Sequence, residues 1–303
     1  MEIPVIITGS GPSLEQALPV IQRTQNNCLI IAASSSVLAL SSAGITADIV
    51  IATDGGSWAL KHIYPFYRDK KHADASAFAV NLCAALPSQC ADSAQLILND
   101  GSFWQNVVLH ELNLPSVIIP QRGTVTATAV ELAFVLTTGN IYLAGLDFSA
   151  SDIRTHARPY SFDNLFYNRA NRFVPFYSES YARSRLIHQG GSMDIYAAWF
   201  KEQLNKWSKR IYSIGGNKIF EHGEPSPRNG LKKTDDFFKT VEVENSNVFC
   251  EKGIQALLNA FKKTEYAQNI KRELNSLLFS GENEVTEREL ETVIKEICIK
   301  ALA

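Results

Sequence analysis

The feature that most constrains the fold is a series of short apolar segments near the N-terminus, separated by connections with helical spacing. Residues 3–8, 28–33 and 49–53 are three such segments, and each carries almost no polar residue. Strands with this composition are typically buried on both faces of a parallel sheet. The sequence therefore predicts an α/β fold, with a mostly parallel sheet covered by helices on both of its faces.

Further elements continue this alternation. Apolar segments predict strands at residues 76–80, 95–98, 116–119, 141–145 and 210–214, and helical periodicity predicts helices at 37–42, 125–137 and 194–207. Apolar residues at helical spacing also follow residue 13, but Pro19 interrupts them, so we expect a kink or an early end there. Residues 149–185 show no clear period, which predicts a long ordered loop.

We expect three regions along the chain. We interpret residues 1–220 as a catalytic α/β domain, in which residues 149–192 are expected to be a lid or acceptor-binding segment. Gly, Pro, Ser, Asn and charged residues indicate a linker at 221–240. Residues 241–303 are expected to be helical, with a capping box at Thr286 and Glu289, and to pack on the main domain or form a homo-oligomer.

Composition excludes some classes of function. The chain has 303 residues and a formal net charge of -2, which gives no electrostatic case for binding nucleic acid. Its 5 cysteines are scattered and lack the spacing of a metal site, and they suit a reducing cytoplasm. No apolar stretch reaches transmembrane length, and no signal peptide is recognisable. We therefore expect a soluble cytoplasmic protein.

The first apolar segment ends in the sequence GSGPSL, and a helical pattern follows at once. Glycines let the backbone approach an anion closely, and the N–H groups of a helix's first turn point toward it. We predict a phosphate-binding turn formed by Gly9, Ser10, Gly11, Pro12 and Ser13. A strand-to-helix turn that only packs tightly is the alternative.

Polar residues also follow other predicted strands, namely Ser34 and Ser35, Asp54, and Asp147. Because ligands of open parallel sheets bind outside the carboxyl ends of the strands, we expect these side chains to line a nucleotide site. Asp54 and Asp147 suit a ribose, a sugar hydroxyl or a Mg²⁺ ion, but equally the cap of a helix or turn.

Three further residues precede the helix predicted at 125–137, namely Arg122, Gly123 and Thr124. The N–H groups of that helix and the guanidinium group are suited to an anion, although an ordinary solvated arginine is equally consistent. His156, His188 and Tyr160 lie in the polar, aromatic segment that follows. A histidine with an ordinary pKa near 6.5 accepts a proton near neutral pH, but each of these residues also suits packing or the surface.

Several well-known motifs are absent from the sequence. There is no GxxxxGK[ST], no HExxH and no paired CxxC, so neither a P-loop kinase nor a dedicated metal site is predicted. The turn differs from GxGxxG, and serines stand where a dinucleotide-binding protein has an acidic residue after its second strand. Dinucleotide binding is therefore disfavoured.

Five segments, taken in order, resemble the MAF motility-associated glycosyltransferases: GSGPSL, SSAGITADIVIATD, RGTVTATAVELAF, NIYLAGLDFSASDIRTH and IYSIGGNKI. These are bacterial flagellin glycosyltransferases whose core is shared with 6-hydroxymethylpterin diphosphokinase-like proteins. The resemblance spans roughly residues 3–220, and the ordered series is more specific than any one motif. It implies a Rossmann-like sheet of the sialyltransferase-like GT-A variety.

A more distant resemblance is to bacterial sialyltransferases that use CMP-sialic acid. Those enzymes carry GNGPSL, a GT before a helix, YLSGIDF, YAFD and an IGHSKNTDI-type segment, and the counterparts here are GSGPSL, residues 123–124, YLAGLDF, YSFD and residues 186–195. The resemblance implies that His188 is the general base for the acceptor hydroxyl and that Tyr160 hydrogen-bonds the departing phosphate. The residues implied for the CMP site are Gly9, Gly11, Ser13, Thr124 and the strand end with Gly145, Asp147 and Phe148.

The chain departs from the sialyltransferase pattern at two positions. Ser10 replaces the asparagine of the turn, and Ser149 stands in place of a second tyrosine, while His156 follows the motility-factor pattern. The first hypothesis is a metal-independent transferase that moves a nonulosonic sugar from a CMP-activated donor to flagellin, another protein or a glycan, and needs no cofactor. The alternatives are Mg²⁺-dependent diphosphate transfer from ATP to a hydroxymethylpterin, and an inactive nucleotide-binding or assembly protein.

Overall fold

The computed structural model describes residues 2–226 apart from short gaps at 69–71, 73, 88–89, 91–92, 103–104, 107, 110–113, 189–190, 208 and 216–218. The chain divides into two compact units, one of Met1–Leu96 with Ile119–Val241, the other of Ile97–Ile118 with Glu242–Ala303. Most of the predicted linker and the whole predicted C-terminal helical region lie outside the described residues.

The first unit is built on parallel strands in the order β4-β3-β2-β1-β7-β8. Their bounds are β1 (Val5–Thr8), β2 (Leu29–Ala33), β3 (Ile49–Ala52), β4 (Ala77–Val80), β7 (Ile141–Ala144) and β8 (Ile211–Ile214). Every residue of β1, β2, β3, β4 and β7 is buried, as expected for strands covered on both faces. In the second unit, the end of β5 (Gln95–Asn99) pairs in parallel with β6 (Val117–Ile118).

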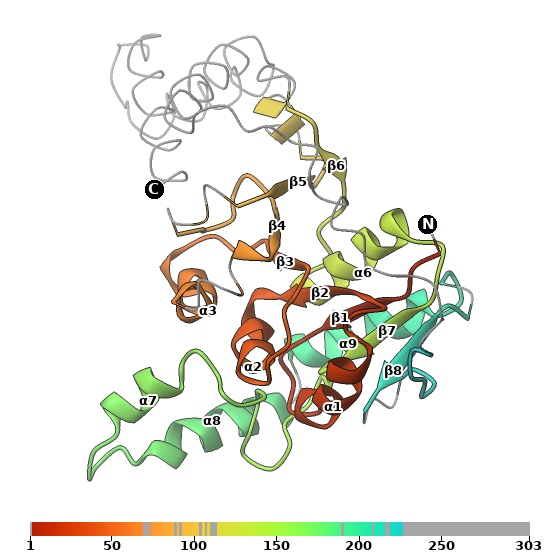
Figure 1. The fold of residues 1–303 in the computed structure, drawn as a ribbon. Helices are drawn as coiled ribbons and strands as arrows, with labels where there is room; N and C mark the ends of the chain where they lie inside the picture. The colour runs from red at the N-terminus through yellow and green to blue at the C-terminus, as the bar shows by residue number, and fades with distance from the viewer. Residues whose placement is uncertain are drawn as a thin grey trace, which may run out of the picture. The chain divides into compact units, whose positions relative to one another are not determined.

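Helices cover both faces of this sheet (Figure 1). One face packs against α1 (Leu14–Thr24), α2 (Val37–Ser42) and α3 (Ser57–Tyr67), whose apolar residues form one core cluster with Ile6, Ile30 and Val50. Alternate strand residues point to the opposite face. There α6 (Val125–Leu136) packs along β1 and β2, and α9 (Ser192–Gln203) lies behind the strands in Figure 1. The predicted α/β class with helices on both faces is therefore confirmed.

Two expectations about local structure need correction. The first concerns Pro19, where we expected a kink or an early end of the helix: the early end does not occur, because α1 continues through this residue to Thr24. Proline removes one helical hydrogen bond, but Leu14, Ala17 and Ile21 are fully buried on either side of it, and their burial holds the helix together.

The second is the loop expected over 149–185, because this segment contains α7 (Asp163–Arg169) and most of α8 (Phe176–His188). The two helices pack on each other and extend beside the sheet in Figure 1. Large apolar residues of this hairpin, such as Tyr177 and Tyr181, are exposed. Helices that do not press one face onto the sheet need no regular apolar stripe, so periodicity did not identify them.

Candidate active site at the carboxyl ends of β1 and β7

The strand order places a topological switch point between β1 and β7. The chain passes from β1 to β2 on one side of the sheet and from β7 to β8 on the other. In open α/β sheets a ligand crevice forms outside the carboxyl ends of the strands at such a point. Here those ends carry the GSGPSL turn and the segment Gly145–Phe148.

Glycine is required where these two strand ends meet. The ideal position of a Cβ atom on Gly9 lies 2.6 Å from the carbonyl oxygen of Gly145. Gly145 itself has a φ of +68°, and a Cβ atom there meets the backbone of Gly9 and, at 2.8 Å, the Cβ atom of Leu14. A side chain at either position therefore collides with backbone that the neighbouring strand holds in place.

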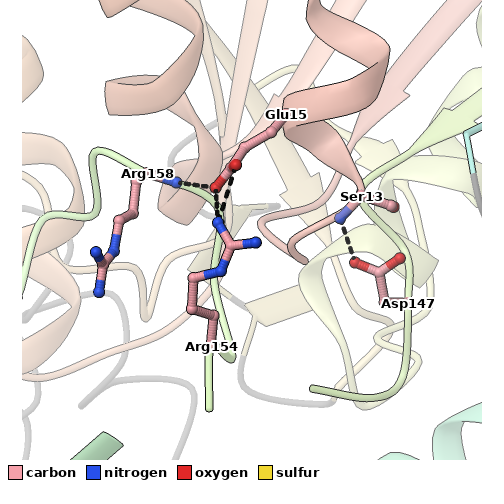
Figure 2. A network of polar contacts seen from close by, with 5 residues as sticks. All are labelled: Ser13, Glu15, Asp147, Arg154 and Arg158. Atoms are coloured by element: carbon pink, nitrogen blue, oxygen red, sulfur yellow. Dashed lines mark hydrogen bonds and ion pairs between the residues drawn. The ribbon is translucent and has the colours of Figure 1, made fainter. Parts of the chain in front are cut away.

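Three backbone N–H groups of the turn, those of Gly9, Gly11 and Ser13, are paired within the chain. Gly9 N donates to Ala144 O and Gly11 N to Gly145 O, each at 2.8 Å. Ser13 N donates to the carboxylate oxygen Oδ2 of Asp147 at 2.8 Å, as Figure 2 shows. Asp147 thus occupies the position at the start of α1 that an anion was expected to take. Phosphate binding by this turn stays a prediction, and it requires either that Asp147 move or that other groups supply the donors.

Ser10 joins three segments. Its Oγ accepts a hydrogen bond from Ser35 Oγ at 3.0 Å, and its carbonyl oxygen accepts one from Ala157 N at 2.8 Å. The neighbouring Ser34 is buried and begins the short 3-10 turn η1 (Ser34–Ser36). The structure therefore brings Ser10 and Ser35, at the ends of β1 and β2, together. It also places Ala157, the residue after His156, beside Ser10.

A carboxylate that the sequence reasoning missed holds the following segment in place. Glu15 accepts two hydrogen bonds from Arg154 Nη1, at 3.1 and 3.0 Å, and one from the backbone N–H of Arg158 at 3.0 Å (Figure 2). Glu15 lies in the first turn of α1, directly after the predicted turn. The contact fixes residues 154–158 beside the start of that helix.

His156 and Tyr160 stack on each other within this segment. Their ring centroids lie 4.0 Å apart with an interplanar angle of 10°, and His156 Nδ1 forms a 2.8 Å hydrogen bond with Thr155 Oγ1. Burial, with smaller contributions from His62 and Arg183, lowers the pKa of His156 to about 4. Burial raises the pKa of Tyr160 to about 12. Both rings are therefore neutral at pH 7.

A second group of side chains comes from α3, which was not predicted. The ring of His62 lies 5.7 Å from Tyr160 and 4.9 Å from Phe162, centroid to centroid, and Trp58 stacks on Phe162 at 5.8 Å. Asp54, at the end of β3, is exposed and raises the pKa of His62, although burial has the larger, lowering effect. The sequence signal for α3 is the helical spacing of Ala59, Ile63 and Phe66, of which Ile63 and Phe66 are buried in the core.

The residues predicted before the helix at 125–137 lie at the start of α6. Thr124 caps α6 by accepting a hydrogen bond from Ala127 N at 3.0 Å, and Thr126 in the first turn lies beside Gly9. Arg122 pairs with Glu131 at 3.0 Å and lies over the ring of Trp199 on α9, so its described contacts are structural. The backbone of Gly123 has a φ of +78° at the turn before the helix.

Phe148 has a φ of +53° and packs its ring 5.2 Å from that of Phe200, which anchors the end of β7 on α9. The helix α8 ends at His188, but the side chain of His188 lies outside the described part of the chain. Its predicted role as a base therefore stays a prediction. No cluster of three or more His, Cys, Asp or Glu suited to a metal ion occurs among the described residues. None of the described helices is long and apolar enough to cross a bilayer.

Comparison with known proteins finds a matching family and a relative of similar sequence. The family described as 6-hydroxymethylpterin diphosphokinase MptE-like matches residues 2–152. An uncharacterised protein of Treponema pallidum (strain Nichols) is 30% identical over 224 residues, which are 73% of this chain and 46% of that protein.

Solved structures also match the chain. A MAf glycosyltransferase from Magnetospirillum magneticum AMB-1 matches with a TM-score of 0.51 and 11% identity, over 100% of this chain and 50% of that one. A mutant of the α-2,3/8-sialyltransferase CstII matches with a TM-score of only 0.33 and 16% identity, over 82% of this chain and 99% of that one, which is too low to bear on the fold.

The chain spans about half the length of the Treponema protein and of the MAf glycosyltransferase. At 11% identity the structural match shows a shared fold. The family match runs from the start of β1 to beyond the end of β7, so it includes the GSGPSL turn and Asp147. The resemblance that the sequence motifs indicated is thereby confirmed: the chain is related to the MptE-like proteins and shares its fold with a MAf glycosyltransferase.

Proposed function

We propose that this chain is the catalytic core of a glycosyltransferase that moves a nonulosonic, sialic-acid-like sugar from a CMP-activated donor to a hydroxyl group. The acceptor in this proposal is a Ser or Thr of flagellin or of another protein, or a glycan. CMP leaves as the sugar passes through an oxocarbenium-like transition state, and no metal ion is required. The cytoplasmic location expected from the cysteines stays part of the proposal.

One observation carries the proposal. Asp147 hydrogen-bonds the GSGPSL turn at the switch point of the sheet, and Ala157, next to the His156 ring that stacks on Tyr160, hydrogen-bonds Ser10 of the same turn. The shared fold of a MAf glycosyltransferase supports the same reaction class. A site with polar side chains at strand ends and a protonated tyrosine beside them is suited to a negatively charged leaving group.

The roles follow from the protonation states. Tyr160, with a pKa of about 12, keeps its proton at neutral pH and is the group we assign to donate a hydrogen bond to the departing phosphate. A base works best with a pKa near the working pH, so His156, with a pKa of about 4, is a weak base in the free protein. We therefore give His156 the role of holding the Tyr160 ring by stacking, and keep His188 as the base that the sialyltransferase-like motif implies.

The assignment is tested by sugar transfer from a panel of CMP-nonulosonates to purified flagellin, followed by mass spectrometry of the acceptor. Loss of a general base typically lowers a rate by about 10²–10⁴-fold. His188→Ala should lose transfer by this factor and retain CMP affinity, whereas Tyr160→Phe should slow transfer and keep the stacked ring. Equal transfer by His188→Ala and wild type would remove His188 from the mechanism.

The second candidate is diphosphate transfer from ATP, which the description of the matching family favours. That reaction needs Mg²⁺ to neutralise phosphate charge, and Asp54 and Asp147 are the candidate ligands. Calorimetry with CMP and with ATP, each with and without Mg²⁺, separates the two proposals. Tight, Mg²⁺-dependent binding of ATP with no binding of CMP would reverse their order.

A further inference from the structure

His62 reaches the proposed site from a helix that no sequence motif marks. The helix α3 begins at Ser57, shortly after the carboxyl end of β3, so Trp58 and His62 lie one turn apart on the same side of it. The ring of His62 packs against Phe162 and Tyr160, at 4.9 and 5.7 Å between centroids. It therefore lies beside the tyrosine to which we assign the leaving phosphate.

The Nδ1 atom of His62 is buried and has no hydrogen-bond partner among the described residues. Buried polar atoms are nearly always paired in folded proteins, because burying one without a partner destabilises the fold. An exception beside a candidate reacting group therefore calls for an explanation. A ligand that completes the hydrogen bond when it binds is such an explanation.

Charged and titratable groups of both signs surround His62. Burial lowers the pKa of His62, and the negative charge of Asp54, which follows β3, opposes this effect. From the segment packed against α3, His156 is the titratable neighbour, and Arg183 of α8 acts on both His156 and Tyr160. The exposed Asp54 carboxylate opposes an anion here, whereas the Arg183 guanidinium and the imidazoles of His62 and His156 favour one. The charge of a bound anion favours protonation of His62 and strengthens the hydrogen bond.

A phosphate beside Tyr160 needs donors other than the three paired N–H groups of the GSGPSL turn. The N–H groups of Gly9, Gly11 and Ser13 already donate within the chain. The side of the site formed by Tyr160 and His62 still offers a phenol hydroxyl and an unpartnered ring nitrogen.

We propose that His62 is a further substrate-binding residue, and that its Nδ1 hydrogen-bonds an anionic phosphate oxygen of the nucleotide donor beside Tyr160. This inference rests on the proposed function for the location of the phosphate, but not for the identity of the base or the sugar. It entails that a bound anion raises the pKa of His62.

The first test uses His62→Phe, which keeps an aromatic ring against Phe162 and removes both ring nitrogens. Loss of a charged hydrogen bond weakens binding by about 10- to 100-fold. In calorimetry, His62→Phe should bind CMP weaker by this factor, and cytidine, which has no phosphate, equally well. Because Nδ1 has no partner to lose, the melting temperature should not fall.

His72→Phe is the matched control. Its Nδ1 forms a 2.8 Å hydrogen bond with Thr46 Oγ1, and the residue is buried beside Thr46 and Ser76, which precede β3 and β4. His72→Phe should lower the melting temperature and leave CMP affinity unchanged, which is the opposite pattern. If wild type binds CMP and His62→Phe binds it equally tightly, the inference is overturned.

A second measurement separates failure of the inference from failure of the proposed function. In wild type, the Hε1 resonance of His62 is titrated by NMR alone and with CMP, ATP or inorganic pyrophosphate. The inference expects a higher pKa of His62 with at least one of these anions. A rise with ATP or pyrophosphate only would refute the CMP donor but support the anion contact. No rise with any of the three would overturn the inference itself.

Discussion

Substitution of Gly145 by alanine tests the close approach of β1 and β7 on which the candidate site depends. Its φ of +68° puts any L-residue in the left-handed region, which costs about 1–2 kcal/mol. The added methyl group also meets the backbone of Gly9 and the Cβ of Leu14, and overpacking of this kind costs about 1–3 kcal/mol. We therefore expect the free energy of unfolding of Gly145→Ala to fall by about 2–5 kcal/mol.

Gly44 provides the control for this prediction. Its φ of +72° is nearly the same, but a Cβ atom there comes only within 4.0 Å of one atom, Gln22 Nε2 at the end of a flexible side chain. Gly44→Ala should therefore show the left-handed cost alone, about 1–2 kcal/mol. Urea unfolding followed by circular dichroism measures both variants. If Gly145→Ala loses no more stability than Gly44→Ala, the tight contact between the two strand ends is refuted.

Three further predictions concern the site and its support. Because folded His156 has a pKa of about 4 and an unfolded histidine one near 6.5, the unfolded chain binds the proton first as the pH falls. The neutral ring contributes about 3 kcal/mol of stability, which should be present above pH 6.5 and lost toward pH 4. Urea unfolding at the two pH values should show a smaller difference in the free energy of unfolding for His156→Gln than for wild type. Glu15→Gln should lower the free energy of unfolding by about 1 kcal/mol, and it should slow transfer because the segment around Arg154 is held less firmly. Glu224 forms an exposed pair with Arg23, so Glu224→Gln should change the free energy of unfolding by less than about 0.5 kcal/mol. Thr124→Ala should lower stability by about 1 kcal/mol through loss of the α6 cap, and Thr124→Ser, which keeps the hydroxyl, should not; equal losses would contradict the capping role.

Strand positions were predictable because they depend on local composition. Segments such as residues 28–33 and 141–145 contain too little polar surface to face water, so the parallel sheet follows from the sequence. The helix predicted at 125–137 is also present, as Val125–Leu136, since its apolar stripe and its Thr124 cap are both local signals. The α7–α8 hairpin was missed because it makes few of the sheet contacts that impose a period.

The sequence by itself determined the α/β class, the small residues at the strand ends and the family relationship, because each depends on residues close together in the chain or on an ordered series of motifs. Tertiary structure alone decided which polar groups are already used. It paired Asp147 with Ser13 over a separation of 134 residues and Glu15 with Arg154 over 139. It also brought His62 beside Tyr160 from a helix that carries no motif. Hydrogen-bond partners and burial are set by chain packing across these distances, and they decide which atoms remain available to a ligand.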